Sequence, residues 1–140
     1  MCNSTKMTKS ALIKNFRSNP RKLFLIDGLG AILTAFMLGV VFVNNQEHIG
    51  MPRNVLIILS LLACVFLVYS FTCYIKSFKN WRVLLRIIAF ANLGYCCITM
   101  ALLYVNFQSL TLLGLIYFIA EIIIIVGLVY MEFLVANDKK

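Results

Sequence analysis

Long apolar stretches separated by short polar segments dominate the pattern of the chain. At about 1.5 Å per residue, each stretch is long enough to cross a hydrocarbon core of about 30 Å as a helix. Membrane β-strands would instead show segments of about 10 residues with alternating polarity, and the sequence has none. The pattern predicts four membrane-spanning helices over residues 23–43, 55–75, 83–105 and 110–135.

The polar connectors are short, so consecutive helices are expected to be antiparallel neighbours. They comprise residues 44–54, 76–82 and 106–109. Helix starts are expected at Asn19-Pro20, as N-cap and first helical residue, and at Asn80 and Ser109 as N-caps. The sequence therefore predicts an all-α, polytopic, antiparallel four-helix bundle over residues 23–135. Residues 1–22 form an N-terminal segment, and residues 136–140 form a tail.

Composition supports this prediction, because 62% of the 140 residues are hydrophobic and only 13% are charged. A soluble domain has about 45–50% apolar and roughly 25% charged residues. The balance excludes an ordinary soluble enzyme, a disordered tail and a disulfide-stabilised secreted module.

Positive charge gathers at one side of the predicted bundle and sets its orientation. Lys and Arg concentrate in segments that stay cytoplasmic, so both termini are expected inside, with residues 44–54 and 106–109 outside. The same residues account for most of the net charge of +8. We expect anionic lipid at the cytoplasmic face and no nucleic-acid partner. The basic residues of this side are Lys6, Lys9, Lys14, Arg17, Arg21, Lys22, Lys76, Lys79, Arg82, Arg86, Lys139 and Lys140.

The N-terminal segment has two further interpretations. A basic leader of roughly 22 residues is long for a signal peptide, and no small-x-small cleavage site follows Val43, so the first span is expected to be a retained helix. The leader lacks acidic residues and carries Ser, Lys and Arg, which is also typical of a mitochondrial presequence. Residues 11–17 combine apolar and basic side chains and could lie as a short helix at the inner interface. A flexible basic tail is the alternative.

Three ionisable residues within the spans share one shallow layer. Asp27, Arg86 and Glu132 all lie about 4–6 Å from the inner ends of their helices. We expect an Asp27–Arg86–Glu132 cluster that joins the first, third and fourth helices. Ionisable groups in spans are costly. The three residues are therefore either a structural ion pair that fixes the helix order, side chains that only snorkel to the interface, or a gate or substrate site.

Glu121 lies near the middle of the membrane, about 16 Å from the outer end of its helix. A carboxyl group at this depth is expected to be protonated and to need hydrogen-bond partners. We predict a contact of Glu121 with Asn92 or Tyr95, with Ser60 and Thr99 at similar depth. This set is either a neutral interhelical bond that holds the bundle together or a proton-, cation- or ligand-binding site.

Helix geometry adds two relationships. Glu132 follows Glu121 by eleven residues, which places both carboxyl groups within about 20° on one face of the fourth helix. On the first helix, Ala31, Ala35 and Gly39 form a small-xxx-small stripe that permits close backbone approach. That approach serves packing within the chain or a homo-oligomer.

Catalytic and cofactor motifs are missing from the sequence. The single histidine, His48, lies in a predicted outer loop, so bis-histidine haem and an intramembrane histidine metal site are excluded. No P-loop, dinucleotide fingerprint or zinc-protease motif is present. We expect neither an enzyme nor a bound metal or cofactor.

Four segments resemble those of small four-span membrane proteins from Bacteroidetes-type bacteria. They are GMP at residues 50–52, YSFTCY at 69–74, ANLGYC at 91–96 and LTLLGLIYFIAEI at 110–122. The resemblance implies a bacterial inner-membrane protein and no particular activity. Small multidrug transporters have a similar size, but their functional carboxylate lies near mid-membrane in the first helix. Asp27 is too shallow for that role, so their function is not carried over.

Two classes of function follow from these features. The first is a structural or partner-interacting bundle whose polar groups hold its helices together. The second is a small oligomeric, proton-coupled transporter or small-molecule-binding protein centred on Glu121.

Overall fold

The computed structural model describes residues 2–76 and 79–137, apart from the side chains of residues 2–4, 6 and 9. The side chains of Lys6 and Lys9, and the whole of Lys139 and Lys140 with most of the predicted tail, therefore lie outside what the structure describes. The elements are α1 (Cys2–Ser18), α2 (Arg21–Phe36), the π-helical η1 (Met37–Phe42), α3 (Gln46–Ile49), α4 (Arg53–Lys76), α5 (Trp81–Val105) and α6 (Leu112–Asn137).

The described part of the chain is all-helical, as predicted. Four of its helices are long and apolar enough to cross a membrane, with α2 and η1 forming one continuous span. Each span ends within two residues of its predicted bound. The spans are Arg21–Phe42, Arg53–Lys76, Trp81–Val105 and Leu112–Asn137.

Two predicted N-caps are wrong in detail. Pro20, not Asn19, takes the N-cap position of α2. At the start of α6, Thr111 is the capping residue, because its Oγ1 accepts the N–H of Gly114 at 3.1 Å. Ser109 instead donates its hydroxyl to the carbonyl of Asn106. Both corrections reflect local turn geometry, in which a shift of one or two residues changes which side chain can reach the free N–H groups.

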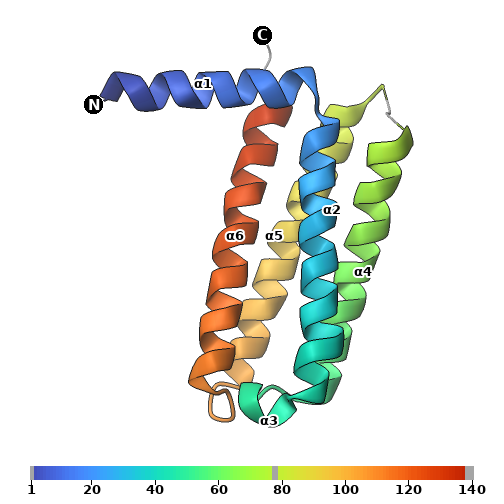
Figure 1. Ribbon diagram of the computed structural model, residues 1–140, viewed down its shortest axis with the longest axis vertical. Coiled ribbons are helices and arrows are strands. Elements are labelled where there is room, and N and C mark those ends of the chain that lie inside the picture. The colour runs from blue at the N-terminus through green and yellow to red at the C-terminus, as the bar shows by residue number, and fades with distance from the viewer. Residues whose placement is uncertain (1, 77–78, 138–140) are drawn as a thin grey trace.

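The long helices form two closely packed pairs, α2 with α4 and α5 with α6 (Figure 1). A smaller contact between α4 and α5 joins the pairs, whereas α2 and α6 are not a closely packed pair. Helix α1 lies across one end of the bundle and α3 lies at the opposite end (Figure 1). These ends are called the α1 end and the α3 end below.

The N-terminal segment is helical from Cys2 to Ser18, longer than the short interfacial helix predicted over residues 11–17. Helix α1 contacts both α6 and α2. Phe16 packs against the apolar cluster at the α1 end of the bundle. Ile13 lies against the end of α6, beside Phe133 and Leu134. The helix is therefore docked on the bundle by its apolar side chains.

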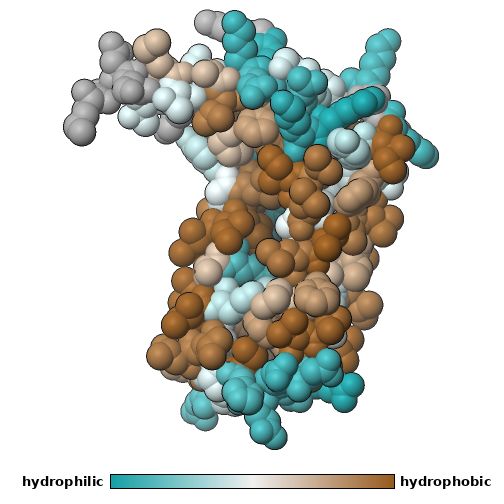
Figure 2. All heavy atoms as spheres, viewed as in Figure 1, coloured by the Kyte–Doolittle hydropathy of each residue, from teal (hydrophilic) through white to brown (hydrophobic). Residues whose placement is uncertain are grey.

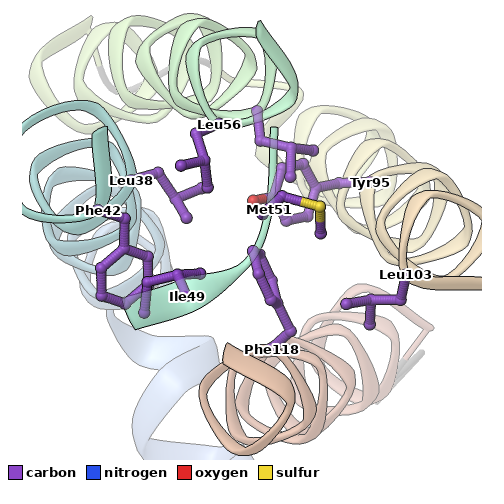
Figure 3. Packing of buried hydrophobic residues seen from close by; sticks show 9 residues of the cluster. Leu38, Phe42, Ile49, Met51, Leu56, Tyr95, Leu103 and Phe118 are labelled. Atoms are coloured by element: carbon purple, nitrogen blue, oxygen red, sulfur yellow. The ribbon is translucent and has the colours of Figure 1, made fainter. Parts of the chain in front are cut away.

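Apolar side chains from every long helix fill the α3 end of the bundle. In Figure 3 the labelled residues of this cluster point toward one another from η1, α3, α4, α5 and α6. We call it the α3-end core. Several of its members are fully buried. They include Leu38, Met51, Leu56, Leu59 and Phe118.

The turn after α3 needs the backbone freedom of glycine. Gly50 adopts a φ of 75°, in the left-handed region. A side chain there would also collide with the backbone of residues 109–111. The N–H of Thr111 donates to the carbonyl of Ile49 at 3.1 Å, and its hydroxyl donates to the carbonyl of His48 at 2.6 Å. These bonds tie α3 to the start of α6.

The outward faces of the long helices are strongly apolar. Large exposed side chains include Leu33 on α2, Val68 on α4, Phe90 on α5 and Ile124 on α6. Figure 2 shows a hydrophobic band between two hydrophilic ends. Such a band suits contact with lipid hydrocarbon and explains why a fold with so few buried residues needs no further cover.

Candidate functional site

A pocket of about 490 Å³ lies between α2 and α6, where these two helices are not closely packed. Figure 2 shows a hollow on this side with hydrophilic atoms inside the otherwise hydrophobic band. The walls come from α2 and α6, with α4 and α5 behind them and α1 at one end. Its polar lining residues are Asp27, Thr34, Asn92, Tyr95, Tyr117 and Glu121.

Glu121 supplies the carboxyl group in the middle of the pocket. Its side chain is only 7% exposed. Oε1 accepts two hydrogen bonds, from Thr34 Oγ1 on α2 at 3.0 Å and from the Tyr95 hydroxyl on α5 at 3.3 Å. Oε2 is buried and has no hydrogen-bond partner. Hydrogen bonds therefore fix Oε1 of the carboxyl group, whereas Oε2 has no donor.

The structure brings Tyr95 to Glu121, as one of the two predicted contacts, but it does not bring Asn92 there. Asn92 Nδ2 donates instead to Asp27 Oδ1 at 2.6 Å. The physical reason is the rise of α5: Asn92 lies three residues, or about 4.5 Å, nearer the α1 end than Tyr95. That height is the level of Asp27.

Asp27 is the second carboxyl group of the pocket and is 4% exposed. Its Oδ1 accepts from Asn92, and its Oδ2 accepts from the hydroxyl of Ser70 on α4. Asp27 therefore joins α2, α4 and α5 at the α1 end of the pocket. Seven residues separate it from Thr34 on the same helix face, so the two carboxyl sites are about 10 Å apart along the bundle.

Glu132 lies behind this second site. It is 0% exposed, and neither of its carboxyl oxygens has a hydrogen-bond partner. Its electrostatic neighbours are Asp27 and Asn92. Val135 and Ala136, which follow Glu132 on α6, pack in one buried cluster with Leu23 and Phe24, which precede Asp27 on α2. The two acids therefore lie at the same level of the bundle.

The predicted participation of Arg86 in this cluster is wrong. Arg86 is exposed, and no ion pair joins it to Asp27 or Glu132 within residues 2–76 and 79–137. Arg86 and Asn92 are six residues apart on α5, so their side chains point about 120° apart around the helix. With Asn92 directed at Asp27, Arg86 is turned away from the acids.

The two remaining residues predicted at the level of Glu121 do not reach it. Ser60 donates its hydroxyl to the carbonyl of Ala35 at 3.1 Å and so joins α4 to α2. Thr99 is fully buried on α5, with its hydroxyl lacking a hydrogen-bond partner. Similar depth therefore did not imply contact for either residue.

The small-residue stripe of the first span serves packing within the chain. Ala35 accepts the Ser60 hydrogen bond through its carbonyl. A side chain at Gly39 would collide with the hydroxyl of Ser60. Ala31 lines the pocket. The stripe thus brings α2 and η1 close to α4 and leaves space on the side of α6.

Sequence reasoning missed two donors that complete the carboxyl sites, Thr34 and Ser70. Thr34 follows Asp27 by seven residues and so shares its helix face, which was the available signal. Ser70 lies about as deep in the second span as Asp27 does in the first, so matching depths would have found it.

The chemistry of the pocket is that of a cation site in apolar surroundings. Two carboxyl groups line it, and no lysine, arginine or histidine is among its lining residues. Aromatic rings of Phe16, Phe66 and Tyr117 face the same space. In the part of the chain that the structure describes, no group of three or more potential ligands could hold a metal ion.

No protein-family model, no curated protein and no solved structure matches this chain, and the resemblance to small four-span bacterial proteins stays a prediction from short motifs.

Proposed function

We propose that this protein binds a lipophilic organic cation in the pocket between α2 and α6. The observation that carries the proposal is the carboxyl group of Glu121. One oxygen is fixed by Thr34 and Tyr95, while the other is buried and without a hydrogen-bond partner, in a residue that lines an apolar pocket. A bound ammonium or phosphonium group would supply the missing counter-charge.

The pocket selects positive charge because its ionisable side chains, Asp27 and Glu121, are both acidic. Phe66, Tyr95 and Tyr117 add aromatic rings, whose faces attract cations within about 6 Å. The remaining surface is mostly aliphatic, and the volume lies within the roughly 300–1,000 Å³ of typical small-molecule sites. A ligand with an apolar body and one positive charge matches all three features.

A purely structural role for the polar residues is the competing hypothesis. Polar groups that only join helices are expected to satisfy one another, since an unsatisfied buried group is costly. Asp27 fits that role, because Ser70 and Asn92 occupy both of its oxygens. Glu121 and Glu132 do not fit it, because three of their four oxygens are without a partner.

The ligand enters from the bilayer, between α2 and α6. The α3-end core closes the bundle beyond Tyr117, so no path continues through that end. At the other end, Phe16 of α1 forms part of the pocket wall. The pocket is thus open sideways and lies in the half of the bundle nearer α1.

We further propose a bacterial inner membrane as the location, with both termini in the cytoplasm. Exposed basic residues gather at the α1 end, where Lys14, Lys22, Lys76 and Lys79 lie. This asymmetry follows the positive-inside rule and would place anionic lipid headgroups at the same end. The pocket then faces the cytoplasmic leaflet.

The test uses two ions of the same shape and opposite charge, tetraphenylphosphonium and tetraphenylborate. Their equilibrium binding to the detergent-purified full chain is measured for the wild type and for Glu121→Gln. We expect saturable binding of the cation only, at one per chain. Loss of the carboxylate should weaken binding about tenfold or more, equivalent to about 1.4 kcal/mol.

Glu47→Gln is the matched control, because Glu47 is an exposed acid on α3, outside the pocket. It should bind the cation as tightly as the wild type. Equal binding of the two ions, or binding that Glu121→Gln leaves unchanged, would contradict the proposal. The absence of saturable binding would favour the partner-interacting bundle.

A further inference from the structure

Glu132 is a buried carboxyl group that the proposed ligand site does not use. It is 0% exposed and is not among the residues that line the pocket. Neither of its oxygens accepts or donates a hydrogen bond to the described residues. A group so isolated from solvent requires something to neutralise it.

Its neighbour Asp27 is in the opposite situation. Both oxygens of Asp27 accept hydrogen bonds, from Ser70 and from Asn92. When two carboxyl groups lie close together in a low dielectric, ionising both costs a large electrostatic free energy. One proton held by the pair removes that repulsion.

Within residues 2–76 and 79–137, no lysine or arginine is among the groups that act on either acid. On α4, Cys73 is buried in the apolar cluster of this end, and Tyr69 donates its hydroxyl to the carbonyl of Leu84. On α5, Asn92 is neutral and Arg86 is exposed. From α1, Phe16 lies toward the pocket, and the half-buried Arg17 makes an interaction of its own.

We infer that Asp27 and Glu132 form a proton-binding pair, which holds one proton when the pocket is empty and releases it when a cation occupies the pocket. The route for the proton is Asp27, which belongs to the pair and also lines the pocket. Glu132 has no exposure of its own, so exchange proceeds through Asp27 and Asn92.

Charge balance gives the coupling its physical basis. The entering cation brings one positive charge into the pocket, which favours ionisation of both carboxyl groups of the pair. The proton that leaves removes one positive charge, so the total charge of the protein–ligand site stays unchanged. No bond other than that between the proton and its carboxyl oxygen is made or broken.

The inference rests on the proposed function for its ligand, and the experiment separates the two. Tetraphenylphosphonium is added to the full chain in weakly buffered detergent solution, and both bound cation and released protons are measured. This cation has no titratable group, so any proton comes from the protein. The wild type is expected to release up to one more proton per bound cation than Glu132→Gln, which should still bind the cation.

Equal proton release by the wild type and by Glu132→Gln, with binding intact, would overturn the inference and leave the proposed function standing. If Glu132→Gln does not fold, Glu132→Met replaces the acid by an apolar side chain of similar size and serves the same comparison.

If the wild type does not bind the cation, the proposed function fails and infrared spectroscopy tests the pair alone. The C=O stretching band of protonated carboxylic acids is then compared at neutral and at alkaline pH. A pH-dependent part of this band that is lost in Glu132→Gln and kept in Glu121→Gln supports the proton pair. The same pH-dependent band in Glu132→Gln overturns it.

Discussion

Asp27 and Asn92 lie 65 residues apart in the sequence and form a 2.6 Å hydrogen bond between α2 and α5. This bond joins the two closely packed helix pairs near the α1 end of the bundle. Ser70 extends the connection to α4. The Asp27 site therefore fixes the back wall of the pocket, while the side between α2 and α6 stays open.

Asn92→Leu is expected to destabilise the protein by about 1 kcal/mol, because it removes a buried interhelical hydrogen bond and leaves Asp27 Oδ1 unpaired. Thermal unfolding in mild detergent measures the effect. Thr72→Val is the control, since the exposed Thr72 bonds only to the carbonyl of Val68 in its own helix. A larger loss of stability from Thr72→Val would show that the Asp27–Asn92 bond does not hold the helices.

Arg86→Gln is expected to change stability by no more than about 0.5 kcal/mol, because an exposed residue outside ion pairs contributes little. The same unfolding measurement decides between this structure and the cluster predicted from sequence. Were Arg86 the counter-ion of Asp27 and Glu132, its loss would leave two buried acids unpaired. Unfolding at a much lower temperature would then be observed.

The spans could be predicted from the sequence because hydropathy is a strong, local signal. Residues 55–75 were predicted and Arg53–Lys76 is observed, and the other spans agree as closely. The antiparallel order follows from short connectors. The docking of α1 was less predictable, since the amphipathic pattern around Phe16 fits an interfacial helix and a helix packed on α6 equally well.

The pocket could be predicted only in part. Depth along a helix indicates the level of each polar residue and predicts a contact of Glu121 with Asn92 or Tyr95, of which the structure shows Tyr95. Depth does not show in which direction around the helix axis a side chain points. For this reason Arg86 was wrongly placed in the acid cluster. Depth also does not show which helix pairs separate, so the pocket between α2 and α6, and with it the role of Thr34, required the structure.

Two glycines provide a matched pair for testing close helix approach. A methyl group at Gly114 would collide with the carbonyl oxygen of Ile49, whereas one at Gly94 would meet open space. Gly114→Ala is expected to lower stability by about 1–3 kcal/mol through overpacking. Gly94→Ala should raise it by up to about 1 kcal/mol through helix propensity. Equal responses in thermal unfolding would contradict the contact between α3 and α6.

The proposed orientation predicts that both termini lie on the cytoplasmic side. Fusions of a reporter that is active only in the cytoplasm, placed after residue 140 and before residue 1, should both be active. Replacing Lys76, Lys79 and Arg82 by Gln removes the charge of the connector between α4 and α5, and should increase the fraction of inverted chains. Opposite locations of the two termini would contradict a four-span topology.

Thr34 allows a specific test of whether a hydrogen bond to Glu121 contributes to ligand binding. Its hydroxyl donates to Glu121 Oε1 at 3.0 Å and lies on the wall of the pocket. Thr34→Val keeps the shape but removes the donor, so tetraphenylphosphonium should bind about fivefold more weakly, equivalent to about 1 kcal/mol. Thr34→Ser restores the hydroxyl and should recover most of the affinity. If Thr34→Ser binds as weakly as Thr34→Val, the methyl group of the threonine matters and the hydrogen bond does not, which would remove Thr34 from the carboxyl site.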